Sequence, residues 1–296
     1  MIELLKSWGR ALVRAYLRTP LRGKTRLRAI TDPLLAPRGG VEVRSIGASR
    51  VPLSHAHEAT RNMAYGNYEM RDLAAIRPFI KPGDTVVDGG ANVGYFAAHL
   101  ADMVGPNGKV YAFEPGPTPL AFLRQTGGSN RFGTIEVVAF ALSNRAGTGT
   151  FFETEDILAK GYGRIDVRPS AKFSKVGEFI VPVTSIDAFF ADRDVSRLTF
   201  IKIDVEGQEK QVIWGMSGLL DSGYRPVLLT EVTITEDWIG ELRDYAAFLA
   251  QFGYRMYAID GGLHGVKVDD LKPGFHGNVI WAAGGSRLPQ NGSDDR

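Results

Sequence analysis

Short β-branched segments alternate with helical segments from about residue 69 onward, and this alternation limits the possible folds more than any other feature of the chain. It is typical of stacked βαβ units, in which each helix returns the chain to the start of the next parallel strand. Seven strands are predicted, at residues 85–89, 109–114, 135–140, 199–204, 226–231, 254–259 and 278–283. The helices predicted between them cover residues 95–104, 117–126, 208–221 and 241–252. We therefore expect an α/β protein with one open, mostly parallel sheet and helices on both of its faces.

The composition is that of an ordinary globular protein and excludes several kinds of site. The chain has 296 residues, of which 44% are apolar, and a formal net charge of +2. Because it contains no cysteine, it has no disulfide, thiolate zinc site, iron–sulfur cluster or cysteine nucleophile. No apolar run approaches the roughly 18 to 20 residues that span a bilayer, and the N-terminal residues lack a signal-peptide pattern. We expect a cytoplasmic protein, and no pattern indicates its oligomeric state.

Positive charge is concentrated at the N-terminus, where residues 1–30 carry eight basic side chains and one acidic side chain. Basic residues recur at every fourth position, at Lys6, Arg10, Arg14 and Arg18. Large apolar or aromatic residues recur two positions out of phase, at Leu4, Trp8, Leu12 and Tyr16. The two sets lie on opposite faces of one helix. Either this helix packs on its own domain with a solvated basic face, or residues 1–30 contact an anionic membrane such as the inner membrane surface. Nucleic acid is not expected as a partner, because no basic stripe with interleaved aromatics follows.

A glycine-rich turn follows the first predicted strand, within the string Asp88-Gly89-Gly90-Ala91-Asn92-Val93-Gly94-Tyr95. Such a turn lets backbone approach a ligand closely and aims the free amides of the next helix at it. The second strand ends in Phe113-Glu114-Pro115, and an acid at that position can accept hydrogen bonds from both ribose hydroxyls. The two features together indicate a cofactor that contains adenosine. Asn92 stands where a glycine is frequent, and asparagine tolerates positive φ.

The spacing of the glycines favours S-adenosylmethionine over a dinucleotide. A dinucleotide fingerprint requires G-x-G-x-x-G, but Ala91 occupies the middle glycine position if the motif starts at Gly89. S-adenosylmethionine has no pyrophosphate, and its ammonium group suits a carboxylate near the turn, such as Asp88. An NAD-dependent oxidoreductase remains the alternative at this point.

The fourth strand ends in the string Ile201-Lys202-Ile203-Asp204-Val205-Glu206-Gly207-Gln208-Glu209. In an open parallel sheet the ligand crevice lies at the carboxyl ends of the strands, so Asp204 and Glu206 are expected there. Alternatively, Lys202 and Asp204 form a structural pair and Glu206 merely begins a helix. Glu209 is expected to cap or face solvent.

These strings, with Tyr68-Glu69, Ala141-Leu142-Ser143-Asn144, Ser185-Ile186-Asp187 and Gly215, resemble the FkbM family of S-adenosylmethionine-dependent methyltransferases over about residues 65–284. The resemblance implies a class I methyltransferase, with a Rossmann-like sheet of seven strands whose last strand is reversed. It also implies O-methylation of a hydroxyl on a sugar, a glycan or a secondary metabolite such as a polyketide. The sequence departs from the usual pattern of this family in small ways, at Gly89, Asn144 and Ile186. We expect a basic helix and extension at 1–64, the methyltransferase domain at 65–284 and a flexible tail at 285–296.

The resemblance adds Pro115 and Ala141 to the expected cofactor residues, which are then Asp88, Gly89, Gly90, Asn92, Gly94, Tyr95, Glu114, Pro115, Ala141 and Asp204. A hydroxyl acceptor needs a base to take its proton. The candidates are Asp204, Glu206, Glu231 and a loop histidine, His57, which is two residues from His55. Mg²⁺ held by the three acids is an alternative that we do not favour.

The segment 144–184 is too long for an ordinary connection between a helix and a strand. It forms either a functional lid or a plain β-hairpin, and its aromatic residues could stack on a sugar ring. We favour a glycan acceptor, including a lipid-linked one. A non-catalytic relative that binds the nucleoside without methyl transfer remains a further alternative.

Overall fold

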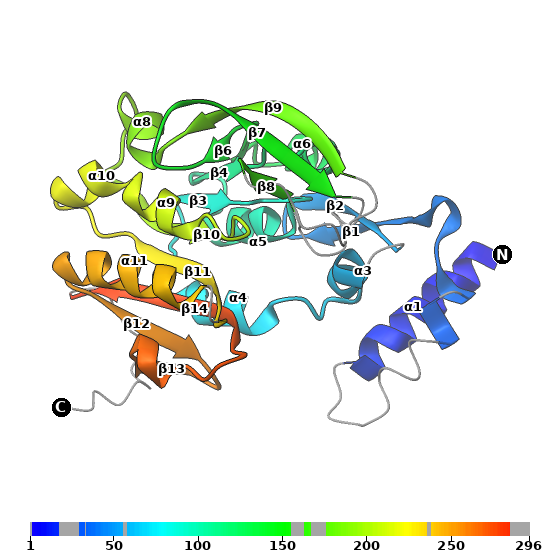
Figure 1. The fold of residues 1–296 in the computed structure, drawn as a ribbon. Coiled ribbons are helices and arrows are strands. Elements are labelled where there is room, and N and C mark those ends of the chain that lie inside the picture. The colour runs from blue at the N-terminus through cyan, green and yellow to red at the C-terminus, as the bar shows by residue number, and fades with distance from the viewer. Residues whose placement is uncertain are drawn as a thin grey trace.

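The computed structural model describes residues 2–17, 30–32, 34–55, 58–154, 163–166, 176–235 and 238–284. Its centre is an eight-stranded sheet (Figure 1) with the strand order β13-β12-β14-β11-β10-β3-β4-β5. The strands are β3 (Thr85–Gly89), β4 (Lys109–Phe113), β5 (Ile135–Val138), β10 (Leu198–Ile203), β11 (Val227–Thr233), β12 (Tyr254–Ile259), β13 (Leu263–Val266) and β14 (His276–Ala283). Strands β5, β4, β3, β10 and β11 pair in parallel, whereas β14 runs antiparallel to both β11 and β12.

All seven predicted strands are present, and the last of them is reversed as the family resemblance implies. The sheet gains an eighth strand, β13, which pairs antiparallel with β12 at the edge. Sequence patterning missed β13 because it has four residues, two of them the exposed His264 and Gly265, and so shows no apolar alternation. The α/β class with a mostly parallel sheet is confirmed.

Helices cover both faces of the sheet, and each face has its own apolar core. One face carries α3 (Glu58–Tyr65), α4 (Met70–Ile76), α5 (Tyr95–Val104) and α6 (Pro117–Ser129). The other carries α8 (Ile186–Phe190), α9 (Glu209–Trp214), α10 (Ser217–Asp221) and α11 (Ile239–Gln251). Alternate strand residues serve the two cores, for example Val86 for the first and Val87 for the second.

The helix predicted at 208–221 is two helices, α9 and α10, which meet at Gly215. A Cβ at Gly215 would lie 2.2 Å from the carbonyl oxygen of Ser143, so the chain needs glycine where it passes this carbonyl group. The bend also presents the Gly215 carbonyl to the Asp187 N–H, which donates to it at 2.9 Å. Periodicity alone does not reveal such a tertiary contact.

The excursion at 144–184 contributes to a second sheet of order β6-β9-β7-β8. Its strands are β6 (Ala141–Leu142), β7 (Gly147–Thr154), β8 (Gly163–Ile165) and β9 (Val176–Thr184). Strands β7 and β9 pair antiparallel from Gly147 opposite Val183 to Thr154 opposite Val176. Because β8 lies between them in the chain and pairs with β7, and β6 pairs with β9, the excursion belongs to a larger sheet than the plain β-hairpin expected as one alternative.

The N-terminal region contains α1 (Ile2–Leu17) and a hairpin of β1 (Val41–Ile46) and β2 (Ser49–Ser54). Ile46, Val51 and Leu53 are buried in the same core as α5 and α6. Three short 3₁₀ turns complete the described elements: η1 (Arg38–Gly40), η2 (Arg77–Phe79) and η3 (Val268–Asp270). In the part of the chain that the structure describes, no helix combines the length and apolarity needed to cross a bilayer.

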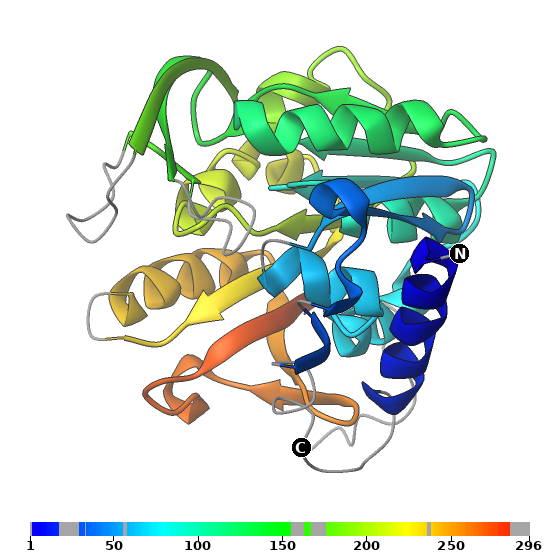
Figure 2. The same ribbon diagram turned by 90° about the vertical axis from the view of Figure 1, so that its right-hand side faces the viewer.

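Helix α1 runs along the outside of the body (Figure 2) and packs with the face opposite to the one expected. The Arg10 side chain is buried and donates to the carbonyl oxygen of Leu35 at 2.7 Å, whereas Trp8 is exposed. The expectation of a docked helix with a solvated basic face is therefore wrong for Arg10. Helical periodicity separates two faces but does not say which one contacts the body.

Candidate functional site

A cavity of about 720 Å³ lies at the carboxyl ends of β3, β4, β10 and β11, where an open parallel sheet places its ligand crevice. Nine of the predicted site residues line it: Gly90, Asn92, Tyr95, Glu114, Pro115, Ala141, Asp204, Glu206 and Glu231. Asp88, Gly89 and Gly94 are not among the lining residues. His57 falls outside the described residues.

The turn after β3 is held in a backbone conformation that few side chains allow. Gly90, Asn92 and Gly94 have φ angles of 76°, 50° and 84°. A Cβ at Gly90 would lie 1.8 Å from the carbonyl oxygen of Asp204, so this glycine is required both for its φ and for the close approach of the two loops. The positive φ expected to be tolerable at Asn92 is present.

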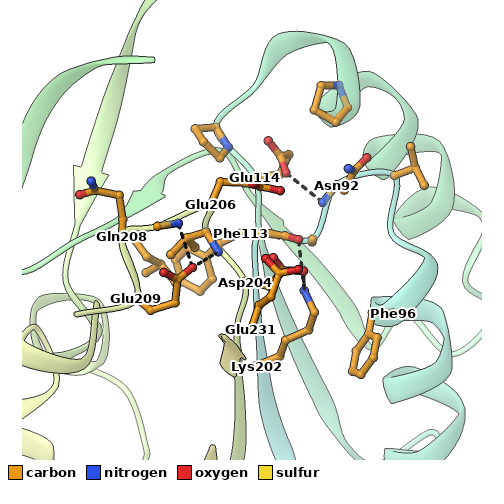
Figure 3. Close-up of a pocket in the computed structure, with 18 of the residues that line it drawn as sticks. Asn92, Phe96, Phe113, Glu114, Lys202, Asp204, Glu206, Gln208, Glu209 and Glu231 are labelled. Atoms are coloured by element: carbon orange, nitrogen blue, oxygen red, sulfur yellow. Dashed lines mark hydrogen bonds and ion pairs between the residues drawn. The ribbon is translucent and has the colours of Figure 1, made fainter. Parts of the chain in front are cut away.

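Glu114 lies at the tip of β4 and ties the glycine turn to the next helix. It is 6% exposed, and one carboxylate oxygen accepts the backbone N–H of Asn92 at 2.9 Å (Figure 3). The other oxygen accepts the backbone N–H of Gly116 at 2.8 Å. Burial raises the pKa of Glu114 to about 7, although both backbone donors oppose that rise. Each oxygen has a second lone pair, so the carboxylate can still accept hydroxyl donors from the cavity.

Lys202 is the buried cation beneath the cavity. Its ammonium lies 3.0 Å from Asp204 Oδ2 (Figure 3). It also lies 3.5 Å from Asp88 Oδ1. Burial lowers the pKa of Lys202, but the surrounding carboxylates outweigh burial, and the net shift is upward. The pairing of Lys202 with Asp204 that the sequence left open is present, and Asp204 still lines the cavity.

Asp88 is completely buried behind the cavity wall. Its burial raises its pKa, and Lys202 opposes that shift. Because Asp88 is not among the lining residues, its carboxylate does not face the cavity directly. Its predicted role toward a cofactor ammonium stays a prediction, and the structure adds a second role as the partner that holds Lys202.

The loop after β10 is fixed by Glu209 and Trp238. Glu209 is buried and accepts the backbone N–H groups of Val205 and Gly207, both at 3.1 Å, so it holds the loop that precedes α9 and neither caps the helix nor faces solvent as expected. Trp238 lies so close to Gly207 that a Cβ there would be 1.8 Å from the ring. These contacts hold Glu206, which has a left-handed φ of 55°, at the edge of the cavity.

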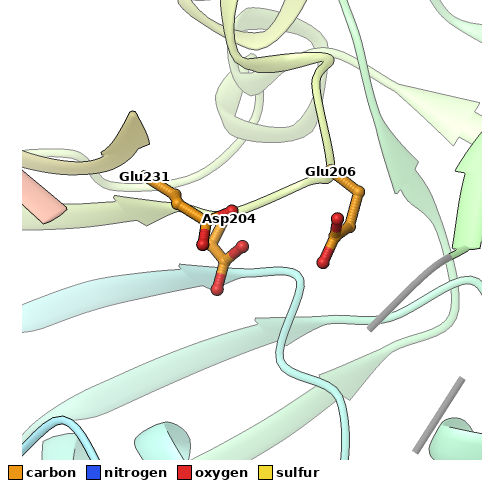
Figure 4. A group of neighbouring side chains, drawn as sticks. All are labelled: Asp204, Glu206 and Glu231. Carbon is orange, nitrogen blue, oxygen red and sulfur yellow. The ribbon is translucent and has the colours of Figure 1, made fainter. Parts of the chain in front are cut away.

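Asp204, Glu206 and Glu231 face one another across the cavity (Figure 4), with one carboxylate oxygen of each within 4.8 Å of the other two. Burial, Asp204 and Glu209 raise the pKa of Glu231 to about 8. A carboxyl group with such a pKa is partly protonated at neutral pH and can exchange a proton there. The three oxygens can also serve a hard divalent cation such as Mg²⁺.

His276 is a site residue to which sequence analysis gave no role. Its Nδ1 lies 2.9 Å from Thr233 Oγ1 and its Nε2 lies 3.5 Å from Glu231 Oε1. The antiparallel register of β11 and β14 sets Thr233 opposite His276, which brings together residues 43 positions apart. No local pattern signals this pairing, because it depends on the reversal of the last strand.

Tyr68 and Glu69 also line the cavity, although the sequence gave them no site role. Burial raises the pKa of Glu69 to about 7, opposed by Lys202 and supported by Asp204. Burial and the adjacent Glu69 raise the pKa of Tyr68. Glu69 has a φ of 48°, and such strain in a non-glycine residue is frequent at functional sites.

The other three histidines that the structure describes are not among the residues that line the cavity. His55 is buried and contacts Glu42 Oε2 at 2.9 Å, while His264 contacts the carbonyl oxygen of Asp260 at 2.8 Å. His99 lies behind Tyr95, and burial lowers the pKa of its imidazole to about 4.

The segment 144–184 contributes Phe151 and Ile165 to the lining of the cavity, whereas Phe152 does not line it. The aromatic residues Tyr162 and Phe173 fall outside the described residues.

Comparisons with known proteins give a consistent set of relatives. The sequence profile of the methyltransferase FkbM domain matches residues 88–256. The 31-O-demethyl-FK506 methyltransferase FkbM of Streptomyces tacrolimicus is 29% identical over 202 residues, which cover 60% of this chain and 75% of that protein. The hexuronic acid methyltransferase AglP of Haloferax volcanii is 31% identical over 140 residues, which cover 47% of this chain and 52% of AglP.

Among solved structures, methyltransferase FkbM from Methylobacillus flagellatus KT is 15% identical to this chain, with a TM-score of 0.42. That alignment covers 76% of this chain and 54% of the other.

Proposed function

This chain belongs to the methyltransferase FkbM domain family and is an S-adenosylmethionine-dependent methyltransferase, and on that premise we propose that it methylates a hydroxyl of a sugar or secondary metabolite. The observation that carries the proposal is the acidic lining of the cavity. Among the described residues that line it, six are acidic and one is a lysine: Glu69, Glu114, Asp204, Glu206, Glu209, Glu231 and Lys202. A cationic ligand would stabilise the ionised form of these carboxyl groups, so a cavity of this kind favours a cationic ligand.

The residues present fit S-adenosylmethionine. Its sulfonium and ammonium groups would supply positive charge to a cavity lined by six acidic side chains. Glu114 retains lone pairs for ribose hydroxyls, and the positive-φ turn at Gly90 allows close approach of backbone. The cavity volume of about 720 Å³ falls within the range of about 300 to 1,000 Å³ found for small-molecule sites.

We assign the cofactor to the end of the cavity formed by Gly90, Asn92, Tyr95, Glu114, Pro115 and Ala141, which we name the cofactor end. Asp88, Gly89 and Gly94 support this end from behind. The end formed by Glu69, Asp204, Glu206, Glu231 and His276 is named the acceptor end. When bound, the cofactor supplies an electrophilic methyl group on a sulfonium.

The chain must orient the acceptor hydroxyl toward that methyl group, exclude water and remove the hydroxyl proton. Glu231 is the proposed base because its pKa of about 8 matches proton transfer near neutral pH. His276 is the proposed positioning residue, because Thr233 orients its ring and its Nε2 faces Glu231. Asp204 is held by Lys202 and is therefore assigned to charge stabilisation rather than to proton removal. His57 stays an untested candidate.

A sugar-like acceptor agrees with the polar acceptor end and with the aromatic side chains of Phe151 and Trp238 on the cavity wall. The names of the two relatives give 31-O-demethyl-FK506 as the acceptor in one case and a hexuronic acid in the other. A glycan, including a lipid-linked one, is the acceptor that we favour.

The test is incubation with S-adenosylmethionine labelled in its methyl group and two acceptor panels, one of hexuronic acid glycans and one of hydroxylated macrolides. We expect label transfer to an acceptor hydroxyl, identified by mass spectrometry and lost in Glu231→Gln. Calorimetric binding of the cofactor without transfer to any acceptor, including those of a cell extract, would support the non-catalytic alternative. Binding of NAD in place of S-adenosylmethionine would contradict the cofactor assignment.

A further inference from the structure

Helix α1 turns its apolar face to solvent. Five large apolar side chains along this face are between 61% and 71% exposed: Ile2, Leu4, Leu5, Trp8 and Leu12. They form one continuous stripe, because positions three and four apart stack on the same side of a helix. Contiguous exposed apolar surface of this kind marks an interaction site.

The opposite face of α1 is fixed to the body by polar contacts. Lys6 donates to the carbonyl oxygen of Ala36 at 3.0 Å, and Arg10 donates to that of Leu35 at 2.7 Å. Arg10 also lies 3.4 Å from Glu42 Oε2, which in turn contacts His55 at 2.9 Å. Since Arg10, Glu42 and His55 are largely enclosed, rolling the helix over would break buried charged contacts.

Packing reinforces the same orientation. Val13 is buried against Tyr65 of α3 and against Leu35. Gly9 allows this approach, because a Cβ there would lie 2.6 Å from a methyl carbon of Leu35. The outward direction of the Trp8 stripe is therefore determined by the inward-facing residues of α1.

The charge of this region decides which occupant fits the stripe. Residues 1–30 carry a net charge of +7, and α1 itself contributes Lys6, Arg10 and Arg14 against Glu3, so two copies that met through this segment would repel each other. An anionic surface would instead attract it, and tryptophan with leucine on the apolar face of a basic helix is the composition of helices that lie in a bilayer interface.

We propose that α1 docks on an anionic phospholipid bilayer, lying in the interface with the stripe of Ile2, Leu4, Leu5, Trp8 and Leu12 inserted among the headgroups and upper acyl chains. The body then stays in water with a fixed orientation, because the buried contacts of Arg10 and Val13 tie the helix to it. Helix α3 links the docking surface to the cavity: its Tyr65 packs on α1, while its Ala59, Asn62 and Met63 line the cavity wall. An acceptor carried by a lipid would thus be presented beside the cavity.

The proposal is tested by sedimentation of the full chain with vesicles of phosphatidylcholine alone and of phosphatidylcholine mixed with phosphatidylglycerol. We expect binding to the anionic vesicles, at least tenfold weaker binding to the neutral ones, and weaker binding as salt is added. The double variant Trp8→Glu/Leu12→Glu should reduce binding to anionic vesicles at least tenfold.

Ile180→Glu is the matched control, because Ile180 on β9 is 75% exposed but lies outside α1. It should leave vesicle binding unchanged, and cofactor affinity should be unchanged in all variants, which shows that they fold. Absence of vesicle binding, or binding that the double variant does not weaken, would overturn the proposal. Self-association in light scattering that the double variant abolishes, without vesicle binding, would assign the stripe to a second copy instead. None of these readouts depends on methyl transfer.

Discussion

The cofactor end and the acceptor end of the cavity differ in the kind of interaction that determines their structure. At the cofactor end the structure is set by backbone: three positive-φ residues, and two backbone N–H groups that bind Glu114. At the acceptor end the structure is set by ionisable side chains. Lys202 pairs with Asp204 at 3.0 Å, and His276 lies 3.5 Å from Glu231. Substitutions at the first end should therefore act through geometry and affinity, and substitutions at the second through charge and rate.

The largest effect is expected for Gly90→Ala. The new Cβ meets the Asp204 carbonyl oxygen at 1.8 Å and also requires a left-handed φ, so the two loops must separate. We expect a loss of about 2 to 5 kcal/mol in the free energy of unfolding and at least 100-fold weaker cofactor binding. Thermal denaturation and calorimetry measure both.

The matched control is Gly128→Ala in α6, where a Cβ meets nothing within 4 Å. It should leave cofactor affinity unchanged and should not lower stability. If the two variants had the same stability and the same cofactor affinity, the proposal that backbone geometry determines the cofactor end would be contradicted.

Glu231→Gln should lower kcat by about 10² to 10⁴ and leave the dissociation constant of the cofactor nearly unchanged, because it removes the proposed base but keeps the shape. His276→Ala should lower kcat less, by about tenfold, as expected of a residue that positions Glu231. Steady-state kinetics with a saturating acceptor provide the measurement. A Glu231→Gln enzyme with wild-type kcat would transfer the base assignment to Glu206 or His57.

Glu114→Ala should weaken cofactor affinity by about 1 to 3 kcal/mol, since ribose hydroxyls and two backbone N–H groups lose their acceptor. Its effect on kcat at saturating cofactor should be small. Glu136→Ala on β5 is the control, because Glu136 pairs with Lys109 outside the cavity. Unchanged affinity in Glu114→Ala would remove this residue from the binding site.

The pH dependence of activity should follow the ionisation of Glu231. Its pKa is raised to about 8, so the base is increasingly protonated as pH falls, and kcat/KM should decrease tenfold for each pH unit well below that value. The positive charge of the bound cofactor favours the ionised carboxylate and should move the inflection below 8. A pH profile that is the same in the wild type and in Glu231→Gln would contradict this account.

The smallest effect is expected for metal removal. Because Lys202 already neutralises Asp204, we expect unchanged activity in excess EDTA. Loss of activity that Mg²⁺ restores would instead show that Asp204, Glu206 and Glu231 hold a metal ion. The ion would then lower the pKa of the acceptor hydroxyl, and this effect would replace proton removal by a base.

Features that depend on local sequence could be predicted, whereas those that depend on packing could not. The middle of the glycine turn, residues 90–93, and Glu114 directly follow strand ends, so their place in the cavity could be derived from spacing. His276 could not be found, because its partner Glu231 is reached through strand reversal. The inward face of α1 was equally hidden, since Arg10 finds Glu42 through tertiary contacts.

The contact between Gly90 and the Asp204 carbonyl oxygen has a consequence for evolution and engineering. Two loops that touch through backbone cannot be remodelled independently, so lengthening or reshaping the 204–207 segment to admit a new acceptor would distort the glycine turn as well. Specificity for a new acceptor is therefore more accessible through the surrounding walls of the cavity, such as the paired strands β7 and β9 and helix α3. These elements can change while the glycine turn and its contact with the 204–207 loop are preserved.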